Sequence, residues 1–117
     1  MSQDGSVVAF ACRGTNLVAN VTYVLNMHGV QDDNVFLWER GSSLLRLVSR
    51  AYYGTETAEE GAAGAVVSAD GRYIVYGSRA VNLVSGITYY ALGPNPNDLT
   101  IANIFRYDRI NNATEVV

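Results

Sequence analysis

The fold is decided by the stretch SQDGSVVAF at residues 2–10, because its pattern returns as SADGRYIVY at residues 68–76. The offset is 66 residues, and the same register continues along the chain. The triplet NLV at residues 16–18 matches the triplet NLV at residues 82–84. Ordered matches at a constant offset predict a tandem structural repeat.

The repeat resumes after an irregular stretch in the middle of each unit. Residues 34–40 (NVFLWER) match residues 103–109 (NIFRYDR), and the offset there is 69 residues. The second unit therefore carries three extra residues in its central loop. Insertions of this kind are tolerated in surface loops, where they cost little free energy.

The sequence of each unit predicts short strands separated by turns. Both Asp-Gly dipeptides tolerate a positive φ angle and precede β-prone runs, which is a strong hairpin signal. No segment keeps a period of 3.6 residues, so we expect an all-β fold. The expected strands are residues 7–10, 35–38 and 44–48 in the first unit and residues 63–67, 73–76, 104–107 and 114–117 in the second.

The composition fits this reading and excludes several function classes. Hydrophobic residues make up 49% of the 117 residues, which is too many for a disordered chain. The net charge is −3, and the basic residues are arginines scattered along the chain, so we expect no nucleic-acid partner. Cys12 is the only cysteine, so no disulfide can form within the chain.

Nothing in the sequence resembles a membrane span or a signal peptide. A span needs about 18 consecutive apolar residues, and no run approaches that length. Residues 1–5 (MSQDG) lack the basic-then-apolar order of an export signal. We therefore expect no membrane partner and no signal peptide in this chain, and a periplasmic or secreted parent protein stays open.

The second unit resembles the WD40-like (PD40, TolB-like) β-propeller repeat. The resemblance is carried by residues 68–76, 82–84 and 104–109. In that family a Ser-x-Asp-Gly turn joins the innermost strand of a blade to the second strand, and an aromatic-rich third strand ends in aspartate. The resemblance extends over most of residues 2–48 and 62–117.

This resemblance implies two tandem four-stranded antiparallel blades of a β-propeller. We expect the first blade at residues 1–50, a connection at residues 51–61 and the second blade at residues 62–117. The first unit has no counterpart of residues 63–67, so its blade is expected to lack the innermost strand, and both termini are expected to lie inside a unit. The loops at residues 19–33 and 85–102 are longer than the Asp/Asn-rich loop of the family, so no ion-binding role is carried over.

The repeated acidic residues are expected to be structural. Asp4-Gly5 and Asp70-Gly71 occupy the same turn in both units, and an aspartate there accepts backbone N–H groups. The neighbouring pairs Glu39-Arg40 and Asp108-Arg109 are expected to cap turns and to form exposed ion pairs. The acidic residues 51–60 are expected to form a solvated connection, and Gly61 to Gly64 a close-packed entry to the strand that follows.

Tyrosines in the long loops are the candidates for ligand binding. Tyr23, Tyr89 and Tyr90 have the amphipathic rings that sugar- and protein-binding surfaces use. Thr22-Tyr23 and Thr88-Tyr89 recur together, so packing of each loop on its own unit is an equally good reading.

The loop residue His28, the only histidine, is the fourth binding candidate. A nucleophile pair of His28 with Cys12 is conceivable, but the second unit has Ser78 and Pro94 in their places, so we expect no catalytic residues. Asp32 and Asp33 could offer oxygen ligands to a cation, but EF-hand spacing is absent, so we expect solvated turn residues and no metal or cofactor.

These features predict a non-catalytic binding or scaffolding module. A propeller blade buries both faces against its neighbours, so two blades leave apolar faces uncovered. The expected partners are further blades in cis or copies of the same chain, three for six blades or four for eight, with a protein or carbohydrate ligand at the loops. Two alternatives stay open: a propeller domain of a larger peptidase, lyase or hydrolase, or an excised or designed fragment for propeller assembly.

Overall fold

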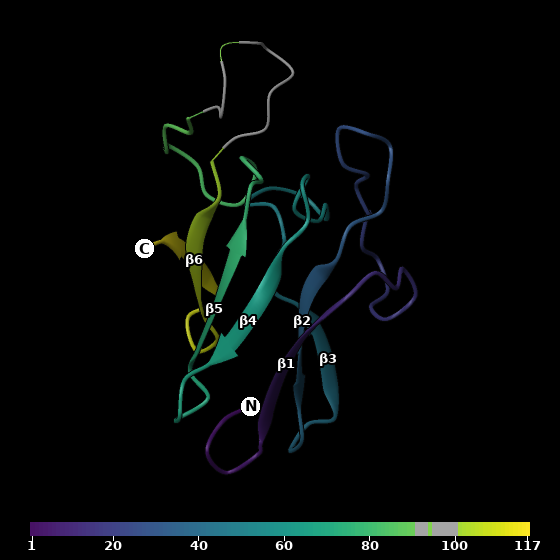
Figure 1. Cartoon of the computed structure of the whole chain (residues 1–117). Coiled ribbons are helices and arrows are strands. Elements are labelled where there is room, and N and C mark those ends of the chain that lie inside the picture. The colour runs from purple at the N-terminus through teal and green to yellow at the C-terminus, as the bar shows by residue number, and fades with distance from the viewer. Residues whose placement is uncertain (91–93, 95–100) are drawn as a thin grey trace.

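A computed structural model describes residues 1–90, 94 and 101–117 of the chain. All regular elements of the described residues are strands, and they form two antiparallel sheets with the orders β1-β2-β3 and β4-β5-β6-β7 (Figure 1). The all-β prediction is confirmed, and each expected strand is present within two residues of its expected bounds. The strands are β1 (Val7–Cys12), β2 (Asn34–Glu39), β3 (Leu44–Leu47), β4 (Ala63–Val67), β5 (Tyr73–Ser78), β6 (Asn103–Asp108) and β7 (Ala113–Val116).

The strands β1, β2 and β3 repeat the pairing of β5, β6 and β7 residue for residue, and β4 is the additional strand of the second sheet. Val7 faces Glu39 at one end of the β1–β2 ladder, and Tyr73 faces Asp108 at the same place in the β5–β6 ladder. These are the positions that the sequence repeat makes equivalent. The outer strands β3 and β7 also pair with β2 and β6 in matching registers. The repeat in the sequence is therefore a repeat of strand pairing.

Backbone conformation repeats at the turns as well. Three pairs of equivalent positions lie in the left-handed region of φ, which glycine and asparagine occupy more readily than other residues. The pairs are Gly5 (72°) with Gly71 (76°), Asn20 (61°) with Gly86 (76°), and Ser43 (52°) with Asn112 (50°). The sequence keeps glycine or asparagine at five of these six positions.

The two sheets pack face to face, and each sheet uses a different one of its two faces for the contact. Each strand has two faces, and cross-strand partners share one of them. We call the front face the one that carries Val35 and Leu37 in the first sheet, and the back face the one that carries Ile74 and Phe105 in the second. These four side chains are fully buried in one hydrophobic cluster. The front of the first sheet therefore covers the back of the second.

The turns that open the two units lie against each other beside this core. Gln3 donates its backbone N–H to the carbonyl of Ala69 at 2.9 Å. A Cβ atom on Gly71 would lie 3.0 Å from the Val7 side chain, so the repeated glycine also permits close approach of the two units. Strands β1 and β4 run beside each other at this junction (Figure 1).

The expectation that residues 51–60 form a solvated connection is wrong for part of this segment, because three of its residues are buried. Thr57 and Ala58 are almost completely buried, and only residues 52–55 are exposed. The buried side chain of Asn82 holds the segment, because its Oδ1 accepts the Glu59 N–H at 3.0 Å and its Nδ2 donates to the Thr57 carbonyl at 2.9 Å. Backbone groups buried in a connection need such partners. The equivalent residue of the first unit, Asn16, is exposed.

Candidate functional site

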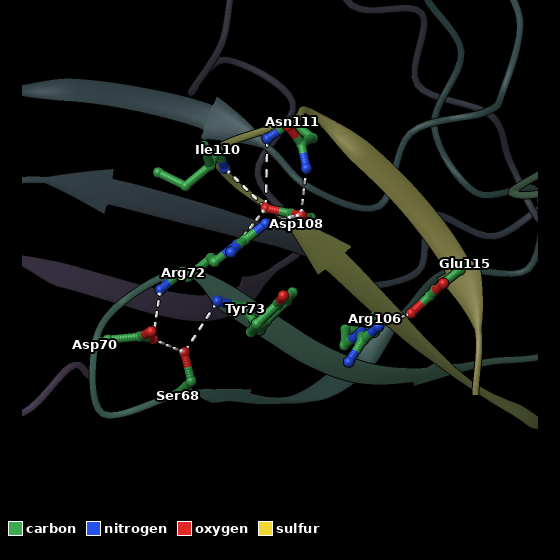
Figure 2. Close-up of polar contacts among 9 residues, drawn as sticks. All are labelled: Ser68, Asp70, Arg72, Tyr73, Arg106, Asp108, Ile110, Asn111 and Glu115. Atoms are coloured by element: carbon green, nitrogen blue, oxygen red, sulfur yellow. Dashed lines mark hydrogen bonds and ion pairs between the residues drawn. The ribbon is translucent and has the colours of Figure 1, made fainter.

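Each Ser-x-Asp-Gly turn is closed by its own side chains. In the second unit, Asp70 Oδ1 accepts hydrogen bonds from Ser68 Oγ at 2.6 Å and from the Arg72 N–H at 3.0 Å (Figure 2). The same contacts hold Asp4 in the first unit, where the hydroxyl and N–H of Ser6 are the main donors and lower the pKa of Asp4 to about 2. Hydrogen bonds to the charged form lower a carboxyl pKa in this way. Both aspartates thus act within the turn.

Asp108 joins the turn of the second unit to the following hairpin. It accepts hydrogen bonds from Arg72 Nε at 3.2 Å and Nη2 at 3.0 Å, and from the backbone N–H of Ile110 at 3.0 Å (Figure 2). The Arg72 guanidinium is the main cause that lowers the pKa of Asp108 to about 2. Asp108 therefore caps a turn, as expected, but its ion-pair partner lies on another turn.

The expected exposed ion pairs of adjacent residues are wrong in both units. The Glu39 carboxylate is only 16% exposed and pairs with Arg46 of β3 and, across the two sheets, with Arg109 Nη1 at 3.3 Å. Arg109 Nε also donates to the Gly71 carbonyl at 2.8 Å. The packing of the sheets brings these residues together, and no local sequence rule predicts it.

We expect the stability of the protein to fall as the pH drops from about 4 to about 2, and Asp108→Asn to remove part of that fall. The pKa of Asp108 is about 2 in the folded chain and is 3.8 ordinarily, so the folded state is favoured above pH 4 and this advantage is lost as the carboxylate is protonated. Urea midpoints measured from pH 7 to pH 2 test this. The variant should be less stable than wild type at pH 7 and should converge with it at pH 2, and a constant difference would contradict the assignment.

The candidate binding tyrosines lie in different environments. Tyr89 packs against the core and donates its hydroxyl to the Val84 carbonyl at 3.3 Å, and burial raises its pKa. Tyr23 is half-buried, whereas Tyr90 is 69% exposed. Thr22, the residue before Tyr23, forms an isolated β-bridge with Glu56 and so ties this loop to the connection at residues 51–60. No described contact joins the three rings, and residues 91–93 and 95–100 of the second long loop lie outside the described residues.

His28 and Cys12 are not assembled into a catalytic pair. His28 is exposed in a tight turn, where its backbone N–H donates to Asn26 Oδ1 at 2.9 Å. Cys12 lies at the end of β1, and its Sγ accepts the Gly14 N–H at 3.2 Å. In the part of the chain that the structure describes, their side chains share no hydrogen bond.

The acidic residues before β2 also have structural partners. Asp32 Oδ2 accepts from Asn26 Nδ2 at 2.9 Å, and Asp33 lies 3.4 Å from Arg13 Nε. Asn34 is buried and accepts the Ser49 hydroxyl at 3.0 Å. The described residues contain no group of three His, Cys, Asp or Glu side chains arranged to hold a metal ion.

Two adjoining cavities of about 270 and 240 Å³ lie where the second sheet meets residues of the first unit and of the connection. Both are lined by Arg50, Tyr107 and Asn112, and the larger is also lined by Arg46. The arginines are separated in the sequence from the two second-unit residues, so the sequence carries no motif for this place. Sequence reasoning missed it for that reason.

Among the described residues, no helix has the length and apolar character needed to cross a bilayer.

Comparison with known proteins adds no family. No protein-family model, no curated protein and no solved structure matches this chain.

Proposed function

We propose that this chain is a scaffolding module whose two sheets are blades of a β-propeller-type assembly, completed by copies of the same chain. The proposal rests on the front-to-back packing of its two equivalent sheets. The front of the first sheet covers the back of the second, so the front face of the second sheet stays open and the back face of the first sheet stays partly accessible.

The open front face of the second sheet carries the counterparts of buried residues. Val35 and Leu37 are fully buried, whereas Ile104, which corresponds to Val35, is 50% exposed. Arg106 corresponds to Leu37 and lies with its guanidinium 4.6 Å from the centre of the Tyr73 ring. An exposed isoleucine on a sheet face flanked by an arginine over a tyrosine is typical of an interaction surface.

The back face of the first sheet is apolar and partly accessible: Phe36 is fully buried within the chain, whereas Phe10 and Trp38 beside it are half-buried. Phe10 and Phe36 stack there with ring centroids 5.8 Å apart, in the same way that Tyr76 and Phe105 stack at 5.7 Å in the buried back face. Trp38 corresponds to the buried Tyr107 and is half-buried. Phe10 and Trp38 thus offer partly accessible aromatic rings at the positions that form the internal contact in the second sheet.

A front-to-back contact between copies joins two different surfaces. Contacts of this heterologous type continue from copy to copy until a ring closes or a filament forms. Exposed Ile104 would then become buried against the half-buried Phe10 and Trp38 of the next copy, as Val35 is buried inside one chain. Self-association by repetition of an existing interface supports the scaffolding role.

Sedimentation velocity over a range of concentrations tests this proposal, with Ile104→Glu and Ile110→Glu as a matched pair. Wild type should sediment as species larger than the 12.7 kDa monomer. The Ile104→Glu variant should weaken association at least about tenfold, because a charge would be buried without a partner. Ile110, 64% exposed at the β6–β7 turn and on neither sheet face, should tolerate the same change.

Circular dichroism of both variants separates loss of association from loss of folding. A folded wild-type chain that stays monomeric at every concentration would overturn the proposal. Equal weakening by the two substitutions would also count against the front face as the contact surface.

A further inference from the structure

The larger of the two adjoining cavities combines an apolar wall with basic groups. Its wall includes Leu45 and Leu47 of β3 and Val21 of the first long loop, and Arg46 and Arg50 also line it. With about 270 Å³ it approaches the size of small-molecule sites, and it adjoins a second cavity of about 240 Å³. The two spaces meet at Arg50, Tyr107 and Asn112.

The charge around these cavities is opposite to that of the whole chain. The protein has a net charge of −3, yet the described residues that line the two cavities include two arginines and no carboxylate. Glu39 already pairs with Arg46. Among the described residues Arg50 has no ion pair, so one positive charge at the cavity is unbalanced.

Hydrogen-bond donors at the same place lack acceptors. Arg46 Nε is buried and has no hydrogen-bond partner in the described structure. The Tyr107 hydroxyl donates to Asn112 Oδ1 at 2.8 Å, so the amide oxygen of Asn112 is occupied and its Nδ2 group remains a donor. A buried donor without an acceptor costs about 1–3 kcal/mol, and an acceptor in the cavity would relieve that cost.

We propose that this cavity binds a small organic carboxylate, with Arg50 as the charge partner and Arg46 and Asn112 as donors. A monoanion balances the single unpaired charge, and an arginine fork matches the planar carboxylate group. The apolar wall of valine and leucine would cover the body of the ligand. This inference is independent of the proposed assembly, because the cavity lies within one chain.

NMR titration of the ¹⁵N-labelled full chain tests the proposal, with benzoate as the probe and the neutral analogue benzamide as its control. Benzoate should shift the Nε–H signals of Arg46 and Arg50 and the side-chain amide signal of Asn112, whereas benzamide should leave them unchanged. The Arg50→Gln variant should weaken benzoate binding at least about tenfold, since a charge-assisted hydrogen bond is removed.

Arg40→Gln is the matched control, because Arg40 is exposed and lies outside the lining of both cavities. It should bind benzoate as wild type does. Asn112→Gly gives a second variant, since glycine keeps the positive φ of 50° at this position while removing the donor. It should also weaken benzoate binding.

The site is overturned if benzoate shifts none of these signals, or if benzamide shifts them equally. Equal loss of binding in Arg50→Gln and Arg40→Gln would likewise overturn it, because that result describes a non-specific effect of charge. Shifts produced by inorganic phosphate alone would show an anion site without the carboxylate selectivity proposed here.

Discussion

Phe105→Ala is expected to lower the free energy of unfolding by about 3–5 kcal/mol, the usual cost of removing a buried phenylalanine side chain. Phe105 is fully buried, stacks on Tyr76 with a centroid separation of 5.7 Å and belongs to the cluster that both sheets share. Its removal leaves a cavity between the sheets and also deprives Tyr76 of its aromatic neighbour. Urea denaturation followed by circular dichroism measures the change.

Ile110→Ala serves as the comparison for this substitution. Ile110 follows β6 directly and is 64% exposed, so its truncation should change stability by no more than about 0.5 kcal/mol. A loss below about 1 kcal/mol for Phe105→Ala would show that the two sheets do not share a packed core.

Gly61→Ala is expected to destabilise the fold by about 3 kcal/mol, through backbone strain and steric overlap together. Gly61 is buried with a φ of +67°, a region that side chains rarely adopt. A Cβ atom there would lie 2.5 Å from the Asp32 Cβ and 2.8 Å from the Asp33 carbonyl oxygen. The second of these is backbone, so the clash can be relieved only by moving the chain before β2 away from the entry to β4.

Gly64→Ala separates the two causes. Gly64 has a similar φ of +71°, but a Cβ atom there would meet nothing within 4 Å. Only the backbone term remains, and a loss of about 1 kcal/mol is expected. Thermal unfolding of both variants measures the difference, and equal losses would mean that residues 61 and 32–33 do not approach as closely as the structure places them.

The strands were predictable because their determinants are local. The alternation of Ile74 and Tyr76 with half-buried neighbours follows from the period of two in a strand. The turn before them depends on Asp70, whose side-chain hydrogen bonds reach no further than Ser68 and Arg72. Because all these contacts lie within five consecutive residues, the sequence of that segment is enough to predict the turn.

The candidate site was not predictable to the same degree. Tyr89 and Tyr90 are adjacent in the sequence, yet one packs on the core and the other is 69% exposed. The cavity residues Arg50 and Asn112 belong to different units and share no spacing rule. Their proximity follows from how one sheet lies on the other.

By itself the sequence determined that the chain is all-β, that two units repeat, and where the seven strands of the described residues begin and end within two residues. Only the tertiary structure decided that the front of one sheet covers the back of the other, that Thr57 and Ala58 are buried, and that Glu39 pairs with Arg109. The physical reason is the range of the interactions. Turns and strand periodicity depend on a few consecutive residues, whereas the choice of packing face depends on the free energy of burying whole surfaces that are far apart in the chain.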